Sequence, residues 1–314
     1  MSAPVEIDPP DISAYRRGNA GVDYVHVLDS GRPGPTAMIQ ALTHGNEFCG
    51  AIALDWLFKE HLELKKGKLV LAFANVAAFA RFTREDPDRS RYIDEDYNRV
   101  WADDQLGGAR SSAELTRARE LRRFVDAADL LLDLHSMHEA CRPIMVCAKS
   151  EKSVALARRV GVPADLLLDT GHPAGLRMIE RGAFSDPASP RAAILIECGQ
   201  HWQKSSVDVA IDTVVRFLAV AGAVGEDFVK PRLRIKAPAQ QRVVRVTEPV
   251  VAETMDFRFA RPWKGLEVVP DAGTVVATDK EKAWKTPYDD CVMVMPSMIH
   301  LKPGTTMVRL GRYG

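Results

Sequence analysis

The sequence predicts an α/β fold in three layers, with helices on both faces of a mixed central sheet, followed by a small all-β domain. Continuous apolar runs such as residues 69–75 (LVLAFAN) and 129–135 (DLLLDLH) are typical of strands covered on both faces. Stretches with apolar residues at helical spacing, such as 50–61, alternate with these runs. After residue 226, prolines recur between short runs of Val, Met and Thr, which indicates short strands and turns.

The first 75 residues predict the order strand, strand, helix, strand. Residues 23–29 and 35–42 are expected to form strands around a Gly- and Pro-containing turn at 30–34. The stretch 50–61 carries its apolar residues on one side, as a helix buried along one face would, and the run at 69–75 follows. Strands and helices in this order are typical of a layered α/β domain.

The amino-acid composition changes at the start of the middle part of the chain. Residues 80–110 are rich in Arg, Asp and Gly without a clear period, which predicts a long functional loop. A helix follows, with Ser111 or Ser112 as its N-cap and Glu114 as the acid of a capping box. We then expect strands at 129–135, 143–148 and 192–197 and helices at 151–160 and 207–223.

A change in pattern near residue 228 predicts a domain boundary. A chain of 314 residues exceeds the usual size of a single domain, so one large domain with a smaller one is expected. We place the larger domain at 1–228 and the C-terminal β domain at 229–314.

The composition excludes several classes of protein. Lys plus Arg and Asp plus Glu both number 42, and this balance argues against a broad nucleic-acid-binding or electrostatic membrane-binding surface. No apolar run approaches the roughly 18 residues of a membrane span. The N-terminus lacks a basic start followed by an apolar core, so no signal peptide is expected. Five cysteines without a C-x-x-C pair predict reduced thiols in a cytoplasmic protein.

The stretch Thr43-His44-Gly45-Asn46-Glu47 lies where an apolar run ends and the first helix begins. A strand that turns on a glycine into a helix places His44 and Glu47 on the same side, where both can reach one cation. Imidazole nitrogen and carboxylate oxygen are ligands of the kind that zinc takes. The H-x-x-E spacing alone is common in unrelated sequences, where it is a surface histidine with a helix-capping glutamate.

His135 supplies the third candidate ligand. It ends the apolar run 129–135, and ligand sites in α/β sheets form where strands end. Three protein ligands leave a fourth zinc position open for water. Asp133 lies two residues earlier on the same face of the strand. It either orients an imidazole or forms a plain buried salt bridge.

Glu197 is the candidate general base. It ends the apolar run 192–197, and a carboxylate in such a place is costly unless it is paired or used. A base there would activate the metal-bound water; the alternative is a glutamate that caps the following loop. Glu139 and Asp133 are the next candidates for the base.

The polar segment 91–99 offers donors for an anionic substrate. Asn98 beside Arg99 presents a fork of hydrogen-bond donors that suits a carboxylate. Arg91 is placed to face an oxyanion next to the metal. Taken by itself, the segment is also typical of a solvated charged loop.

Together these segments resemble the succinylglutamate desuccinylase/aspartoacylase family, whose catalytic domain is similar to that of zinc carboxypeptidases. The likeness covers roughly residues 35–220, and a C-terminal β domain is also expected in this family. The motifs that carry it occur in the family's order: His44-Gly45-Asn46-Glu47, Arg91-Tyr92-Ile93-Asp94 leading to Asn98-Arg99, Asp133-Leu134-His135, and Ile196-Glu197 before Gly199.

The resemblance implies a role for each of these residues. One zinc ion per chain would be held by the ligand set His44, Glu47 and His135. The scissile carbonyl would be polarised by Arg91, a substrate carboxylate would be held by Asn98 and Arg99, and protons would be carried by Glu197. A tyrosine of the β domain can reach the site in this family. Tyr288 is the candidate here, and a packed turn tyrosine is its alternative.

One departure concerns the substrate's second carboxylate. Aspartate-specific members of the family place an arginine and a tyrosine shortly before the base. Here only Arg181 or Arg191 is available, and neither has the family's spacing. Specificity for aspartate or glutamate is therefore not implied.

These observations predict a zinc-dependent amidohydrolase that cleaves an N-acylated amino acid or a similar small carboxylate-bearing compound with metal-activated water. The partner is thus a small molecule, with no nucleic acid and no membrane, and a homo-oligomer is one of the states that the sequence permits. Two alternatives remain open: a metallocarboxypeptidase-type hydrolase of short peptides, and a non-catalytic binding protein on the same scaffold.

Overall fold

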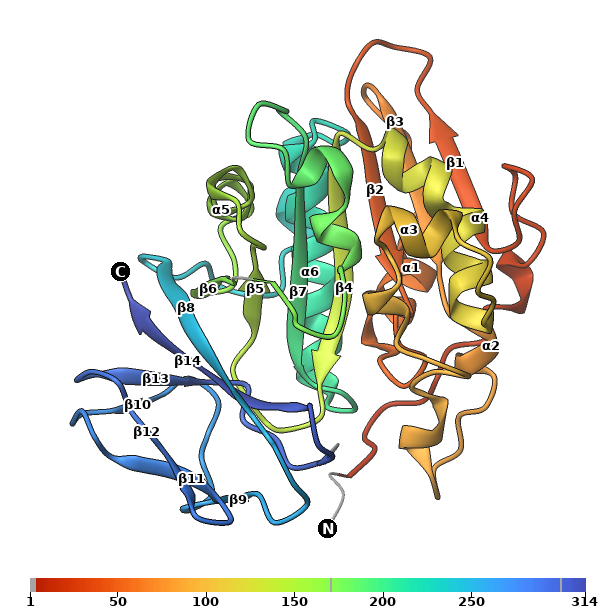
Figure 1. The fold of residues 1–314 in the computed structure, drawn as a ribbon. Helices are drawn as coiled ribbons and strands as arrows, with labels where there is room; N and C mark the ends of the chain where they lie inside the picture. The colour runs from red at the N-terminus through yellow and green to blue at the C-terminus, as the bar shows by residue number, and fades with distance from the viewer. Residues whose placement is uncertain (1–3, 170, 300) are drawn as a thin grey trace.

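The computed structural model describes residues 4–169, 171–299 and 301–314 of the chain (Figure 1). Its strands are β1 (Val25–Asp29), β2 (Thr36–Ala41), β3 (Lys68–Phe73), β4 (Leu130–Met137), β5 (Ile144–Val146), β6 (Asp165–Leu168), β7 (Ala192–Gln200), β8 (Arg242–Val251), β9 (Arg258–Phe259), β10 (Glu267–Val269), β11 (Val275–Asp279), β12 (Lys282–Lys285), β13 (Cys291–Val294) and β14 (Thr306–Tyr313). Its α-helices are α1 (Cys49–Lys59), α2 (Val76–Phe79), α3 (Asp103–Gly107), α4 (Ala113–Ala127), α5 (Glu151–Val160), α6 (Lys204–Val220) and α7 (Glu226–Val229).

A single mixed sheet runs through most of the molecule. Within the described residues it has eleven strands in the order β1-β3-β2-β4-β7-β5-β6-β8-β14-β13-β10. The neighbours β3, β2, β4 and β7 are parallel to one another, so their carboxyl ends meet at one edge. Side chains that follow these strands are thereby brought together, which is the usual place for a ligand site in an α/β sheet.

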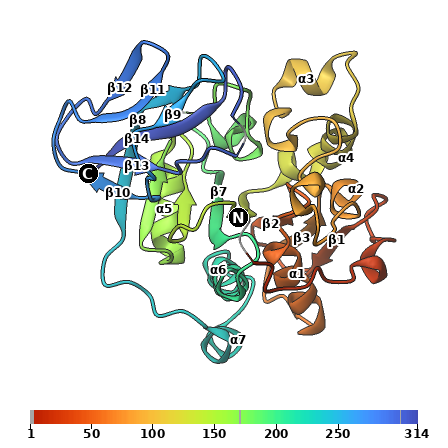
Figure 2. The same ribbon diagram turned by 90° about the horizontal axis from the view of Figure 1, so that it is seen from below.

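Helices cover both faces of the parallel strands, as the sequence predicts (Figure 2). Successive side chains of a strand point to opposite faces. On β4, Leu132 joins the core under α1, α5 and α6, whereas Leu131 joins the core under α4. Both side chains are fully buried. The apolar runs are continuous because each strand is buried on its two faces.

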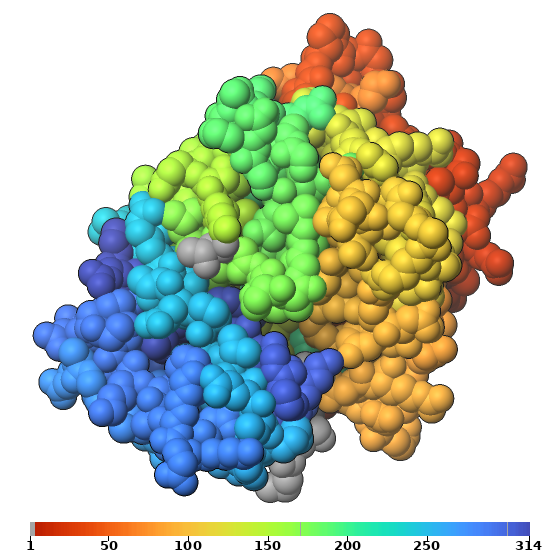
Figure 3. All heavy atoms as spheres, in the orientation of Figure 1, coloured from red at the N-terminus to blue at the C-terminus, as the bar shows by residue number. Residues whose placement is uncertain are grey.

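The C-terminal part of the chain forms antiparallel strands that continue the same sheet. β8 pairs in parallel with β6, and β14, β13 and β10 extend the sheet from it. A separate three-stranded sheet, β12-β11-β9, packs beside them around a core that includes Val250, Phe257 and Val276. Figure 3 shows these blue C-terminal residues against the green middle of the chain. The boundary between 228 and 229 stays a prediction.

The predicted loop at 80–110 contains short helical turns, including the 3-10 helices Pro87–Ser90 and Tyr97–Arg99 as well as α3. It is held in place by Glu114 of α4. The buried Glu114 carboxylate accepts hydrogen bonds from the Asn75 side chain at 2.9 Å and from the backbone N–H groups of Ile93 at 2.6 Å, Asp94 at 3.1 Å and Glu95 at 3.3 Å.

The N-terminus of α4 confirms one detail of the sequence analysis and corrects another. Ser112 is the N-cap, and its hydroxyl accepts a hydrogen bond from the Leu115 N–H at 3.0 Å. The predicted capping-box role of Glu114 is wrong, because its carboxylate bonds the loop before the helix. Among the described residues, no helix combines the length and apolar character that a membrane crossing needs.

Removing the Glu114 carboxylate should destabilise the fold. In Glu114→Ala the Asn75 amide and three backbone N–H groups lose their acceptor, and each such group that stays buried costs about 1–3 kcal/mol. We expect the free energy of unfolding, measured by chemical denaturation, to fall by at least about 2 kcal/mol. The matched control is Glu120→Ala on the same helix, whose half-exposed salt bridge with Arg117 should contribute less than about 1 kcal/mol. Equal losses in both variants would contradict this account.

Candidate functional site

A cavity of about 230 Å³ opens at the carboxyl edge of the parallel strands. His44 follows β2, while His135 and Glu197 are register partners on the neighbouring strands β4 and β7. The cavity brings together seven of the eight site residues that the sequence predicts: His44, Glu47, Arg91, Asn98, Arg99, His135 and Glu197.

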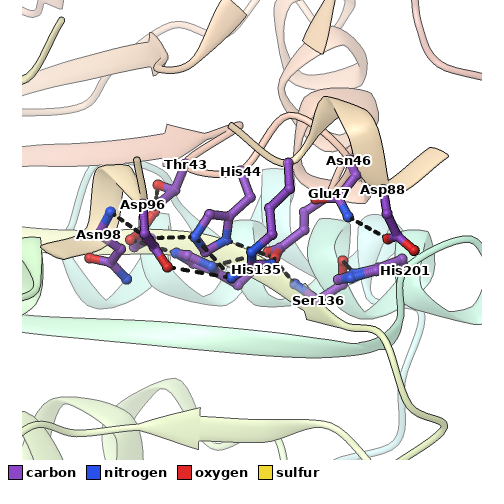
Figure 4. Close-up of polar contacts among 12 residues, drawn as sticks. Thr43, His44, Asn46, Glu47, Asp88, Asp96, Asn98, His135, Ser136 and His201 are labelled. Carbon is purple, nitrogen blue, oxygen red and sulfur yellow. Dashed lines mark hydrogen bonds and ion pairs between the residues drawn. The ribbon is translucent and has the colours of Figure 1, made fainter. Parts of the chain in front are cut away.

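Three buried side chains in the cavity converge as a metal site would require (Figure 4). One ligand atom each of His44, Glu47 and His135 lies within 4.8 Å of the others. The His44 Nδ1 atom lies 2.8 Å from Glu47 Oε1, and the His135 Nδ1 atom lies 3.1 Å from Glu47 Oε2. Two imidazole nitrogens and one carboxylate are a donor set that fits zinc.

Each imidazole is also held by a carboxylate on its outer nitrogen. His135 Nε2 lies 2.7 Å from Asp133 Oδ2, and the other oxygen of Asp133 accepts from the Thr43 hydroxyl at 2.7 Å. His44 Nε2 lies 2.9 Å from Asp96 Oδ1. Such carboxylate partners orient a metal-binding imidazole. The sequence offered Asp133 for this position and missed Asp96, which lies in the loop before Asn98.

Gly45 allows the turn between His44 and Glu47. A Cβ atom at residue 45 would lie 2.3 Å from the backbone nitrogen of Phe79 and 2.3 Å from the carbonyl oxygen of Ser90. The Gly45 N–H donates to the Arg91 carbonyl at 3.1 Å. This close backbone approach joins the first motif to the loop that carries the arginines.

The loop side chains face the same cavity. Arg91 Nη1 donates to Glu47 Oε1 at 3.1 Å. Asp96 accepts from the Asn98 N–H at 2.8 Å and thereby caps the 3-10 turn that presents Asn98 and Arg99. The Asn98 Oδ1 atom accepts a hydrogen bond from the Met178 N–H at 3.0 Å. The Nδ2 group of the same carboxamide is not used in this contact. Only 19% of the Arg99 side chain is exposed.

Glu197 is buried in the cavity without a full set of partners. It is 8% exposed, and its Oε2 atom has no hydrogen-bonding partner in the part of the chain that the structure describes. Burial and then the nearby Glu47 charge raise the pKa of Glu197 to about 8. Of the two alternative bases, Asp133 already accepts a hydrogen bond from the Thr43 hydroxyl, and the Glu139 side chain is 56% exposed. Glu197 is thus the best-placed carboxylate for proton transfer.

Three predicted candidates lie outside this cavity. The Tyr288 hydroxyl is 2.7 Å from the Thr247 hydroxyl, and its ring packs under Arg312. The structure does not bring Tyr288 to the cavity, so we leave it out of the substrate contacts. Arg181 donates to Asp126 at 2.6 Å, and the Arg191 guanidinium lies 3.5 Å from Asp129. Neither arginine lines the cavity.

Other residues line the cavity that sequence reasoning did not assign to it. Three further histidines, His138, His172 and His201, are cavity residues. The Ser136 hydroxyl lies 2.8 Å from His201 Nδ1. Burial lowers the pKa of His201 to about 3, so its imidazole is neutral at ordinary pH. Arg177 and Arg309 complete the charged lining.

The catalytic-domain model of succinylglutamate desuccinylase/aspartoacylase matches residues 33–220. Among solved structures, the succinylglutamate desuccinylase from Chromobacterium violaceum is 18% identical, with a TM-score of 0.65 over 94% of this chain and 89% of that one. The succinylglutamate desuccinylase from Vibrio parahaemolyticus is 15% identical, with a TM-score of 0.64 over 93% and 86%. The ectoine utilization protein EutE (DoeB) from Ruegeria pomeroyi is 16% identical, with a TM-score of 0.61 over 92% and 88%. No curated protein matches significantly.

The close approach at Gly45 gives a testable expectation. In Gly45→Ala the added methyl group meets backbone atoms that cannot rotate away, so the turn must shift. Overpacking of this kind costs about 1–3 kcal/mol, which thermal and chemical unfolding will measure. Gly107→Ala is the matched control, because a Cβ atom there meets nothing within 4 Å. Unchanged stability of Gly45→Ala would show that the turn adapts without cost.

Proposed function

Because the chain belongs to the succinylglutamate desuccinylase/aspartoacylase family, we propose that it is a zinc-dependent amidohydrolase. Its substrate is an N-acylated amino acid or a similar small carboxylate-bearing compound. One observation carries the proposal: His44, Glu47 and His135 converge within 4.8 Å at the cavity that also holds the partly unpartnered Glu197.

The chain's own residues are suited to hold the ion. His44, Glu47 and His135 offer three protein ligands, which leaves a coordination position open for water or substrate. Asp96 and Asp133 fix the outer nitrogens of the two imidazoles, so that both Nδ1 atoms face the Glu47 carboxylate. When bound there, zinc would polarise a carbonyl and lower the pKa of water.

Glu197 acts as the general base and then as the general acid. Its buried carboxylate faces the cavity with one free oxygen, so it can accept a proton from the attacking water. The same carboxyl group then donates that proton to the nitrogen of the leaving amine. The apolar run that precedes Glu197 keeps its backbone fixed within β7.

The arginine loop orients the substrate and stabilises charge. Arg91, held at 3.1 Å from Glu47, faces the oxygen that becomes negative when water adds to the amide carbonyl. Arg99 donates to the Asn98 carbonyl at 2.7 Å and keeps further donors for a substrate carboxylate. The Asn98 Nδ2 group supplies another donor beside it. With these donors, the site would favour a substrate that has a carboxylate on its amine half.

A screen of substrates tests the proposal directly. N-acyl amino acids and short peptides would be incubated with the zinc-loaded protein, and free amine would be measured. Release from N-acyl amino acids supports the proposal. Release only from the C-terminal ends of peptides would instead indicate a metallocarboxypeptidase. A cavity of about 230 Å³ is smaller than typical sites for drug-sized ligands, which favours the small substrate.

The metal site gives the next expectation. Wild-type protein should bind about one zinc per chain, and His44→Ala or His135→Ala should lose most of it, because three ligands leave little redundancy. Zinc content is measured by elemental analysis after dialysis, with circular dichroism as the check on folding. His61→Asn, which alters an exposed histidine beyond α1, is the control and should keep full occupancy. Full occupancy in both ligand variants would refute the assignment.

The general base is tested by Glu197→Gln. The amide has nearly the same shape and Glu197 is not a proposed ligand, so zinc content and fold should be retained. An amide cannot accept the proton of water at neutral pH, and the single-turnover rate should fall by at least about 10²–10⁴-fold. Glu139→Gln, at a half-exposed carboxylate of the same cavity, should change the rate by less than tenfold. Near-normal turnover by Glu197→Gln would place the base elsewhere.

A further inference from the structure

The C-terminal strand β14 supplies part of the cavity wall. Thr306 and Arg309 of this strand line the cavity, and Met295, Pro296 and Ser297 from the segment between β13 and β14 lie beside them. No role has been given above to these side chains. Because they line the same cavity as Asn98 and Arg99, they are candidates for substrate contacts.

Arg177, another arginine of the cavity, is already neutralised. Its Nη1 atom donates to Asp169 Oδ2 at 2.7 Å. Its Nε and Nη2 atoms each donate to one oxygen of Glu180 at 3.0 Å. A guanidinium held by two buried carboxylates has neither charge nor geometry left for a substrate. Arg177 is therefore a structural residue of the cavity wall.

Arg309, by contrast, is not hydrogen-bonded to a carboxylate among the described residues. The closest approach to a carboxylate in the described chain is 3.8 Å, from its Nε atom to Asp169 Oδ2, which is too long for a hydrogen bond. That oxygen already accepts from Arg177. The Arg309 side chain is only 13% exposed, so water does not replace the missing acceptor fully. Thr306 adds a buried hydroxyl that has no partner among the described residues.

Several arginines gather near this place. Burial lowers the pKa of both Arg99 and Arg309; Asp96 near Arg99 and Asp169 near Arg309 oppose the shift, and the neighbouring arginines add to it. Burial, followed by Arg99, Arg309 and Arg177, also lowers the pKa of His172 to about 2. These three arginines therefore lie near one neutral imidazole in the cavity. A buried guanidinium whose N–H groups lack hydrogen-bonded acceptors is costly, and a bound anion that accepts from them removes that cost.

We propose that Arg309 and Thr306 form a second anion-binding subsite, which takes a second carboxylate on the amine half of the substrate. This subsite deepens the proposed function and rests on it. Thr306 and Arg309 line the same cavity as Arg99, the proposed anchor of the first carboxylate, and the Arg309 charge lies near enough to Arg99 to lower its pKa. The charge comes from the C-terminal β region, because Arg181 and Arg191 are engaged elsewhere.

Matched substrates test the subsite. N-acetylaspartate and N-acetylglutamate are compared with N-acetylasparagine and N-acetylglutamine, which have nearly the same shape without the second charge. Wild-type kcat/KM should favour the acidic members by about 10- to 100-fold, the worth of a hydrogen-bonded charge pair. In Arg309→Gln the preference should fall close to one, mainly through a higher KM for the acidic substrates. Arg312→Gln, on the same strand but outside the cavity, should keep it.

Two further experiments test where the second charge binds and whether binding depends on turnover. N-succinylglycine compared with N-acetylglycine tests whether the acyl half carries the charge, and a preference there that depends on Arg309 would overturn the placement. Calorimetric binding of free glutamate and glutamine needs no turnover. Weaker glutamate binding in folded Arg309→Gln supports the subsite even if the amidohydrolase proposal fails. Equal hydrolysis of acidic and neutral substrates, or equal glutamate binding in both proteins, overturns the subsite alone.

Discussion

The burial of Glu47 between two imidazoles is the interaction on which the rest of the site depends. A carboxylate that is 2% exposed is stable only with partners close by, and His44 and His135 come from two different strands to provide them. Their own outer nitrogens then need acceptors, which Asp96 and Asp133 supply. The need to pair one buried carboxylate thus fixes the positions of residues on two strands and a loop.

The same requirement explains why the arginine loop has a fixed shape. The loop has no strand or long helix of its own, and its backbone N–H groups depend on the Glu114 carboxylate of α4. Gly45 ties the loop to the first motif through the Arg91 carbonyl. Arg91, Asn98 and Arg99 are therefore held by groups that do not line the cavity. A rigid support of this kind is what a preorganised site needs.

Much of the fold and the cluster of His44, Glu47 and His135 could be predicted because local patterns encode them. The apolar runs before His135 and Glu197 reveal strands buried on both faces, and a residue that ends such a strand has a known position at the sheet edge. The contact of Asp96 with His44, the contacts of Glu114 with the loop and the place of Arg309 in the cavity are tertiary, and tertiary contacts leave no periodic signal. The position of Tyr288 could not be predicted for the same reason. The packing of the C-terminal β region decides where its ring lies.

The parallel pairing of β6 with β8 has a consequence for how substrates enter and leave. Four register pairs, from Asp165–Arg242 to Leu168–Arg245, join the C-terminal region to the central sheet by backbone hydrogen bonds. A hinge rotation of the whole C-terminal region would break this ladder. Arg309 is therefore carried on a part of the molecule that cannot swing open as a rigid lid. The connecting loops, which in proteins move on a faster timescale than whole domains, are the parts left to widen the cavity.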